Sequence, residues 1–341
     1  MFDLNLLIRP NIATLKPYSS ARDEYKGKDG TFLDANENPY GNLNRYPDPQ
    51  QAELKRLLAQ KNGVTPKNIF IGNGSDELID LVFRIFCEPG KDTALTFTPT
   101  YGMYTVSAAM NNIELKECPL NNSFDIDLEK ALLMIEAFQP KLVFVCSPNN
   151  PTGNILDQEA IGTILKSTKG IVIVDEAYID FSDSPSWTNF LSDYPNIIVS
   201  QTFSKARGLE AARVGIGYSS TEIISLLNKV KPPYNVSQLN QDAALMALKN
   251  ETQFLTNLNA ILTEKQKLMH AFDKIDCITK VFPSEGNFIL IETKKTEYIF
   301  QSLIEKQIIT RNRSSLIPNT IRISVGTAKE NEELINTLKS L

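Results

Sequence analysis

Short apolar runs alternate with amphipathic stretches through most of the chain. Continuous apolar runs are typical of strands buried on both faces of a parallel sheet, and they occupy residues 92–97, 141–146, 171–175, 196–200 and 214–218. Stretches with helical periodicity separate them, at residues 127–138, 157–167 and 221–230. Strands that alternate with helices of this length predict an α/β fold, with a mostly parallel sheet covered by helices on both faces.

The pattern changes after residue 230. Residues 239–270 are predicted to be largely helical, and two or three β segments follow together with helices near 296–306 and 329–340. A chain of 341 residues is long enough for two lobes. We therefore predict a large domain at residues 31–245. The N-terminal arm, residues 1–30, and residues 246–341 are predicted to form a smaller α+β domain.

Composition excludes several classes of function. Net charge is −5 with no basic cluster, so nucleic acid is not an expected partner. No run approaches the roughly 20 apolar residues of a membrane helix, and the N-terminus lacks a signal-peptide pattern. The single histidine and four scattered cysteines do not suggest a metal site. We read the cysteines as free thiols in a reducing compartment, and we expect a cytoplasmic protein.

A lysine with phosphate-binding neighbours follows the apolar run at 196–200. Lys205 is flanked by Thr202 and Ser204, and Arg213 follows eight residues after the lysine. A lysine amine can bond a carbonyl carbon, whereas hydroxyls and a guanidinium suit a phosphate. One ligand that carries both groups is pyridoxal phosphate (PLP). A surface lysine in a polar loop is the alternative that these residues alone leave open.

The apolar run at 171–174 ends in an acid, Asp175, and Tyr178 follows three residues later. Ligands of open α/β sheets bind at the carboxyl ends of the strands. An Asp at that place can pair with the protonated ring nitrogen of PLP and keep the ring an electron sink. Tyr178 could donate to the phenolic oxygen of the ring. An Asp that only caps the next turn is the alternative.

Residues 68–78 are predicted to form a strand, a glycine loop and the start of a helix. Free backbone N–H groups at a helix start bind anions, and glycine lets the backbone approach a ligand closely. We therefore predict that Gly74, Ser75 and Asp76 hold a phosphate through their backbone, together with Arg213.

Residues 147–153 read S-P-N-N-P-T-G, which is more specific than a generic turn. With the D-x-x-Y and S-K motifs in this order, the chain resembles the class I and II aminotransferases, which are fold-type I PLP enzymes. The resemblance implies PLP as the cofactor. It assigns Lys205 to the aldehyde carbon and to proton transfer, Asp175 to the ring nitrogen, and Asn150 with Tyr178 to the phenolic oxygen.

Four further assignments rest on the resemblance alone. Tyr101 is expected to stack on the cofactor ring, and Tyr18 to lie over the substrate pocket. Asn36, in A-N-E-N-P, is expected near the mouth of the active site. Tyr46, in R-Y-P, is expected to reach the PLP phosphate of a neighbouring subunit, which implies a homodimer.

Two arginines are candidates for substrate binding. Arg322 stands between two apolar residues on a predicted strand, and a charge on a buried face needs an anionic partner. A solvated arginine at a sheet edge is the alternative. In the family, the arginine of R-I-S-x-G holds the α-carboxylate of the donor. Arg311 corresponds to a position where a second anionic group docks.

The resemblance is closest to the histidinol-phosphate aminotransferases. It implies transfer of the amine of histidinol phosphate to 2-oxoglutarate, which gives imidazole acetol phosphate and glutamate in histidine biosynthesis. A threonine-phosphate decarboxylase, which is a PLP lyase, and a broad aromatic amino-acid aminotransferase are the alternatives. The chain departs from the family at Arg207 and at Glu210-Ala211, where phenylalanine and an Ala-Gly pair are usual.

Overall fold

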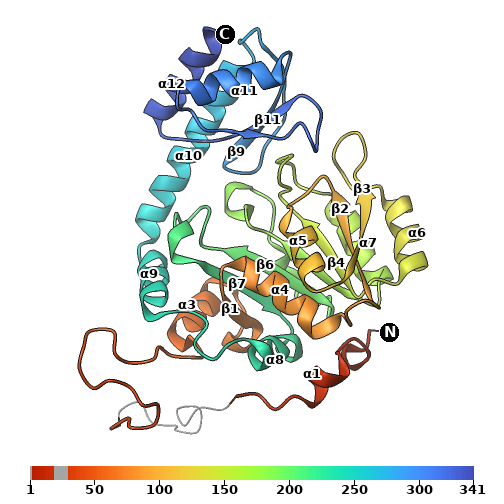
Figure 1. The fold of residues 1–341 in the computed structure, drawn as a ribbon, viewed down its shortest axis with the longest axis vertical. Helices are drawn as coiled ribbons and strands as arrows, with labels where there is room; N and C mark the ends of the chain where they lie inside the picture. Colours follow the sequence, from red (N-terminus) through yellow and green to blue (C-terminus); the bar gives the residue numbers. More distant parts are fainter. Residues whose placement is uncertain (1, 19–29) are drawn as a thin grey trace.

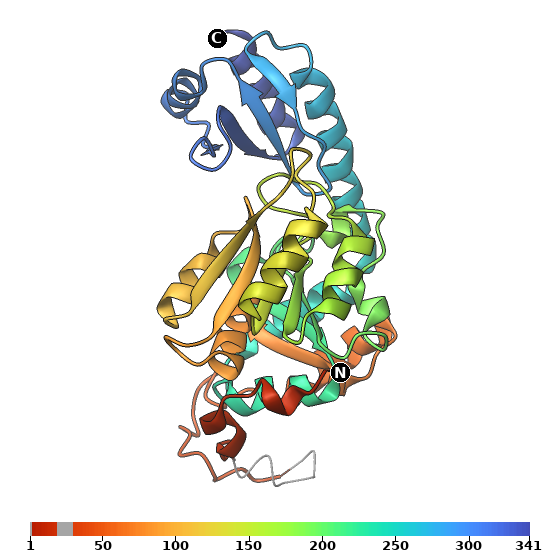
Figure 2. The same ribbon diagram turned by 90° about the vertical axis from the view of Figure 1, so that its right-hand side faces the viewer.

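A computed structural model describes residues 2–18 and 30–341. Within these residues the strands form two separate sheets, one of seven strands and one of four. The larger sheet lies in the middle of Figure 1 and the smaller sheet lies at its top. The long helix α10 (Glu251–Phe272) runs from the lower part of the molecule into the upper part, as the turned view also shows (Figure 2).

The seven-stranded sheet has the order β1-β7-β6-β5-β4-β2-β3. Neighbouring strands from β3 to β6 are parallel, and only β7 runs antiparallel to both of its neighbours. The prediction of an α/β fold with a mostly parallel sheet is confirmed. The strands are β1 (Ile69–Asn73), β2 (Thr93–Thr98), β3 (Glu114–Pro119), β4 (Leu142–Cys146), β5 (Ile171–Asp175), β6 (Ile197–Thr202) and β7 (Val214–Ser219).

Helices cover both faces of this sheet because its central strands are apolar on both sides. On β4, Val143 and Val145 belong to one buried cluster, and Leu142 and Phe144 belong to the other. The first face is covered by α3 (Ala52–Asn62), α6 (Leu128–Phe138), α7 (Gln158–Ser167) and α9 (Gln238–Lys249). The second face is covered by α4 (Ser75–Phe86), α5 (Met103–Met110) and α8 (Thr221–Val230).

The four-stranded sheet is antiparallel throughout, in the order β10-β11-β9-β8. Its core combines strand residues such as Ile289 and Ile323 with Phe272 from the end of α10. Its elements are β8 (Ile278–Val281), β9 (Phe288–Thr293), α11 (Thr296–Glu305), β10 (Arg311–Asn312), β11 (Thr320–Ser324) and α12 (Ala328–Lys339). The domain boundary near residue 245 stays a prediction.

Short elements complete the described part of the chain. In the N-terminal arm, η1 (Leu4–Leu6) and α1 (Pro10–Thr14) lie against the second face through Leu7 and Ile12. Residues 19–29 of this arm are outside the described residues. The remaining short helices are η2 (Pro66–Asn68), η3 (Ile179–Phe181), η4 (Trp187–Phe190) and η5 (Glu210–Ala212). None of the helices in the described ranges has the length and apolar content needed to span a membrane.

Candidate active site

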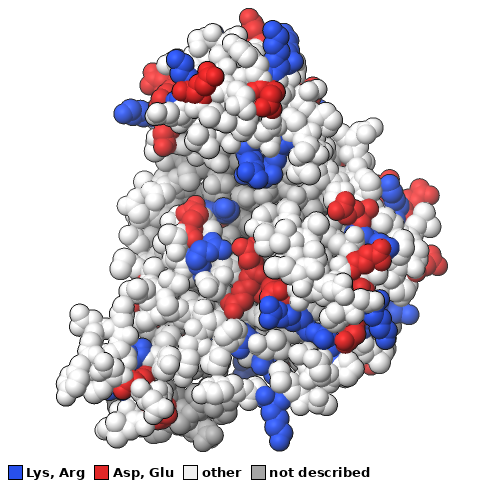
Figure 3. Space-filling model, in the orientation of Figure 1, with Lys and Arg blue, Asp and Glu red and all other residues white. Residues whose placement is uncertain are grey.

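A cavity of about 350 Å³ lies at the carboxyl ends of β4, β5 and β6. Residues from the large sheet form most of its wall, and two arginines near β11 complete it. Lys and Arg side chains also gather at the hollow between the upper and lower parts of the molecule (Figure 3). The lining residues are Ser75, Asp76, Tyr101, Cys146, Asn150, Asp175, Ala177, Tyr178, Thr202, Ser204, Lys205, Glu210, Arg213, Arg313 and Arg322.

Asp175 is the last residue of β5 and is buried. Its Oδ2 accepts a hydrogen bond from the hydroxyl of Tyr104 at 2.7 Å, and its Oδ1 accepts one from the backbone N–H of Ala177 at 3.2 Å. Burial raises the pKa of Asp175 to about 6, although the hydrogen bond from Tyr104 acts in the opposite direction. Asp175 is therefore mainly anionic at pH 7, and it can pair with a cationic group in the cavity.

Lys205 follows β6 and is half-buried beside the same cavity. Its Nζ lies 5.9 Å from the centroid of the Tyr178 ring. Burial lowers the pKa of Lys205, and the charges of Arg322 and Arg213 lower it further, while Glu210 raises it. A lowered pKa increases the share of neutral amine at pH 7, and the neutral amine is the form that attacks a carbonyl carbon.

Asn150 and Tyr178 contact each other in the wall of the cavity. The Nδ2 of Asn150 donates to the hydroxyl of Tyr178 at 3.4 Å. The Oδ1 of Asn150 accepts from Nη1 of Arg322 at 2.6 Å. Burial raises the pKa of Tyr178, so its hydroxyl remains a protonated donor. These two residues are therefore brought together as the sequence predicted.

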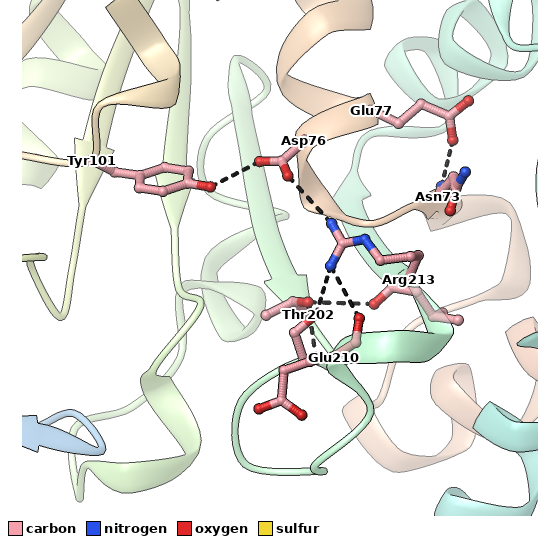
Figure 4. A network of polar contacts seen from close by, with 9 residues as sticks. Asn73, Asp76, Glu77, Tyr101, Thr202, Glu210 and Arg213 are labelled. Carbon is pink, nitrogen blue, oxygen red and sulfur yellow. Dashed lines mark hydrogen bonds and ion pairs between the residues drawn. The ribbon is translucent and has the colours of Figure 1, made fainter. Parts of the chain in front are cut away.

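The glycine loop and Arg213 form one polar network (Figure 4). Nη2 of Arg213 lies 3.3 Å from Oδ2 of Asp76, and Nη1 lies 3.5 Å from Oγ of Ser204. The hydroxyl of Tyr101 donates to Oδ1 of Asp76 at 3.1 Å. The side chains of Arg213 and Asp76 are 45% and 36% exposed, so their ion pair is screened by water. Arg213 can therefore exchange this partner for an anion bound at the start of α4.

Sequence reasoning missed Gly215, which makes this network possible. A Cβ at this position would overlap the backbone of Gly74 and Ser75. Gly74 has φ 79°, and a Cβ there would overlap the guanidinium of Arg213. Two glycines thus let the loop, strand β7 and Arg213 approach closely. The R-x-G spacing after Lys205 is the sequence signal that could have indicated Gly215.

The structure assigns the second arginine of the cavity differently from the sequence. Arg322 lines the cavity as predicted, but Arg311 is exposed and is not part of the lining. Arg313 lines the cavity instead, because β10 ends at Asn312 and the chain turns there. Arg311 pairs directly with Arg322 in the sheet, so it lies beside the cavity. The sequence Arg311-Asn312-Arg313 contains two candidate arginines, and the prediction considered only the first of them.

Both arginines of the cavity have unsatisfied donors. Nε of Arg313 and Nε of Arg322 are buried, and neither has a hydrogen-bond partner within the described structure. Burial lowers the pKa of both side chains, and the neighbouring arginines lower it further. Buried donors on two like charges favour an anionic ligand, since it would satisfy the donors and relieve the repulsion.

Three predicted site residues lie away from this cavity. Tyr18 is 71% exposed. Asn36 and Tyr46 line a separate hollow of about 500 Å³, where the ring of Tyr46 stacks on that of Tyr234 with a centroid distance of 4.4 Å. Within one chain these residues therefore do not meet Lys205.

Tyr104 is a further neighbour of the site that the sequence did not assign. Its side chain is fully buried, and its hydroxyl donates a hydrogen bond to Asp175. Its position one helical turn after Tyr101 is the only sequence signal for it. In the described ranges, no cluster of His, Cys, Asp and Glu could hold a metal ion.

Comparison with known proteins identifies the class of protein that this fold and site define. The family model described as "Aminotransferase class I and II" matches residues 26–338. The chain therefore belongs to the class I and II aminotransferase family. It is 50% identical over 345 residues to a histidinol-phosphate aminotransferase of Christiangramia forsetii, and the match covers 100% of this chain and 98% of that relative.

Solved structures agree with this fold. A histidinol-phosphate aminotransferase from Sinorhizobium meliloti, in complex with pyridoxal-5'-phosphate, is 26% identical with a TM-score of 0.80. That match covers 87% of this chain and 82% of the other. The enzyme from Clostridium acetobutylicum has a TM-score of 0.81 at 24% identity and covers 88% and 91% of the two chains. The predicted fold-type I architecture is thereby confirmed.

The contact between Gly215 and the glycine loop leads to a testable prediction. Gly215→Ala should displace Gly74 and Ser75 and weaken PLP binding about tenfold or more, since overpacking typically costs about 1–3 kcal/mol. Absorbance titration of the apoprotein with PLP measures the affinity. Gly217→Ala is the matched control on the same strand, because its Cβ would meet the flexible end of the Leu78 side chain at 3.1 Å and Phe70 only at an ordinary contact distance of 3.5 Å. Unchanged PLP affinity in a folded Gly215→Ala protein would contradict the prediction.

Proposed function

We propose that this chain is a histidinol-phosphate aminotransferase that uses PLP and transfers the amine of histidinol phosphate to 2-oxoglutarate. One observation carries the proposal: Lys205, buried Asp175 and two arginines with unsatisfied donors share a single cavity. An amine, an anion and paired guanidiniums are the groups that this reaction needs. The name of a relative with half of its residues identical supports the choice of substrate.

The residues of the cavity fit PLP on chemical grounds. Lys205 would bond the aldehyde carbon, and Asp175 would pair with the protonated ring nitrogen. Asn150 and Tyr178 would donate to the phenolic oxygen. The glycine loop and Arg213 would hold the phosphate, with the hydroxyls of Thr202 and Ser204 beside them. When bound, PLP supplies an electron sink for the charge left by removal of a proton from the amine-bearing carbon of the substrate.

Lys205 moves the proton in this reaction. With a substrate amine bound to the cofactor in its place, the amine of Lys205 would be free within the cavity. Burial lowers the pKa of Lys205, which increases the share of its amine in the neutral form that can act as a base. Lys205 would take the proton from the amine-bearing carbon of the substrate and would return it at C4′ of the cofactor. Asp175 would stay ionised and would support the positive charge of the ring.

Arg313 and Arg322 bind the anionic ends of the substrates. One half-reaction brings a phosphate and the other brings carboxylates, and a guanidinium fork suits both groups. Arg322 is fixed by its hydrogen bond to Asn150, so it would orient the end of the substrate nearest the ring. Arg313 has a buried Nε without a partner in the described structure, so it could donate to the second anion.

A homodimer would complete the site. The segment 32–46 is held in shape by Glu37, which binds Arg45 at 2.7 Å and the backbone N–H of Tyr46 at 2.6 Å. Leu33, Tyr40 and Leu43 in this segment are 88%, 83% and 65% exposed, which is unusual for side chains of this size. A second copy of the chain would cover them and bring Tyr46 to the partner's phosphate site.

We also propose that the enzyme works in the cytoplasm. All four cysteines are free thiols, which suits a reducing compartment.

The function is tested by supplying purified protein with histidinol phosphate and 2-oxoglutarate. The proposal predicts glutamate formation that depends on both substrates and on PLP. Threonine phosphate and aromatic amino acids serve as competing substrates. Release of carbon dioxide from threonine phosphate, or faster turnover of an aromatic amino acid, would overturn the proposed substrate.

Lys205 is predicted to bond the cofactor. Reduction of the PLP-loaded protein with borohydride should fix the cofactor on Lys205, and peptide mass spectrometry locates it. Lys265 is an internal control, because burial lowers its pKa too but it lies outside the cavity. Lys205→Ala should bind PLP without turnover. A label on Lys265 or another lysine would refute the assignment.

The arginines are predicted to contribute unequally. Arg322→Ala should lose about 10- to 100-fold in kcat/KM with both histidinol phosphate and glutamate, since a hydrogen bond to a charged group is worth roughly 1.5–3 kcal/mol. Arg313→Ala should show a similar loss, because its guanidinium lines the cavity. Arg311→Ala is the matched control and should lose at most about threefold, because Arg311 is exposed. A larger loss for Arg311→Ala than for Arg313→Ala would reverse the assignment.

Sharing of sites between subunits can be tested with hybrid dimers. Lys205→Ala and Tyr46→Ala chains are each expected to be impaired on their own. After subunit exchange about half of the dimers should be hybrids with one intact site, so activity should recover to about a quarter of the wild-type value. Mixing each variant with itself is the control. A fully active monomer in dilute solution would contradict site sharing.

A further inference from the structure

Tyr104 lies behind the cavity wall, where it can influence the site without contacting a bound ligand. Its side chain is fully buried on α5, and it is not part of the cavity lining, whereas Asp175 is. Its hydroxyl donates a 2.7 Å hydrogen bond to Oδ2 of Asp175, and its ring packs against Tyr101, which also lines the cavity. The hydrogen bond to Asp175 is the polar contact through which Tyr104 can influence the reaction.

Packing fixes the direction of this hydroxyl. The ring of Tyr104 stacks on Phe144 at 4.8 Å between centroids with an interplanar angle of 21°. The ring of Tyr101 packs edge-on against the ring of Tyr104, with 5.6 Å between centroids and an interplanar angle of 87°. Phe144 belongs to β4, the strand next to β5, so the ring is held against the sheet that carries Asp175. The hydroxyl is thus oriented before any ligand enters the cavity.

Two donors from different elements restrain the two oxygens of Asp175. Tyr104 of α5 binds Oδ2, and Ala177, in the turn after β5, binds Oδ1. Hydrogen bonds to a carboxylate favour its charged form. Burial raises the pKa of Tyr104, and the nearby charge of Asp175 raises it further, so the tyrosine stays a proton donor throughout the neutral range.

We propose that Tyr104 is a positioning residue for the transamination, whose hydroxyl holds Asp175 as an oriented carboxylate facing the ring nitrogen of PLP. The inference rests on the proposed function only in that PLP is the cofactor. It does not depend on which amine is the substrate. The alternative is a purely structural role, in which the hydroxyl of Tyr104 contributes to the stability of the fold. Its removal would then leave the affinity for PLP unchanged.

Tyr104→Phe tests the proposal, because it keeps the ring packing and removes only the hydroxyl. PLP affinity of the apoprotein should fall about tenfold, the loss expected for one hydrogen bond to a charged group. Absorbance titration gives the dissociation constant, and the melting temperature of the apoprotein reports folding. In an Asp175→Asn background the same substitution should change PLP affinity by less than about twofold, because the charge that it supports is gone.

Tyr218→Phe is the matched control. Tyr218 lies on β7 of the large sheet and is also fully buried, and its hydroxyl accepts a hydrogen bond from Asn62 at 3.0 Å, away from the cavity. This variant should lose thermal stability but keep wild-type PLP affinity.

The outcomes separate this inference from the proposed function. Equal losses of PLP affinity for Tyr104→Phe in the wild-type and Asp175→Asn backgrounds would mean that Tyr104 acts by packing alone, and would overturn the inference. Wild-type affinity in Tyr104→Phe would do the same. A third outcome is a loss of PLP affinity in Tyr104→Phe that disappears in the Asp175→Asn background, together with no turnover of histidinol phosphate. This outcome would overturn the substrate assignment but would support the role of Tyr104.

Discussion

The site depends on a carboxylate buried at the end of a parallel strand. Transfer of a charge from water into the interior is unfavourable unless hydrogen bonds or an opposite charge compensate for it. Asp175 receives two hydrogen bonds, and its pKa is nevertheless raised to about 6. The protein therefore holds an anion that is only partly compensated by its own groups. A cationic ring nitrogen in the cavity would supply the missing charge, so binding and ionisation support each other.

Positive charge without a partner is found elsewhere in the cavity lining. Arg313 and Arg322 place two positive charges close together, and each has a buried Nε without a partner among the described residues. Among residues 2–18 and 30–341, neither arginine forms an ion pair with a carboxylate. The cavity thus contains one anion that is only partly compensated and two cations with unpartnered donors, so it favours a ligand with a cationic ring and anionic ends.

Patterns within single elements could be predicted from the sequence, but contacts between distant elements could not. The order of strands and helices follows from apolar periodicity, and Asp175 and Lys205 follow from their places at strand ends. Arg313 was missed because β10 is only two residues long, so strand alternation could not tell which arginine faces the cavity. Tyr104 was missed because its bond to Asp175 joins residues 71 positions apart. Such a contact exists only once the sheet and α5 have packed.

The two departures from the usual family pattern have separate structural consequences. Arg207 is directed away from the cavity, where its guanidinium stacks over the Phe254 ring at 3.7 Å and pairs with Glu251 at 3.0 Å. An arginine thus packs its apolar face on an aromatic ring and also joins the loop of Lys205 to the start of α10. Glu210 instead lines the cavity and raises the pKa of Lys205 against the effect of burial. The first change alters how the catalytic loop is anchored to the helix that leads to the small sheet, and the second alters the charge around the lysine itself.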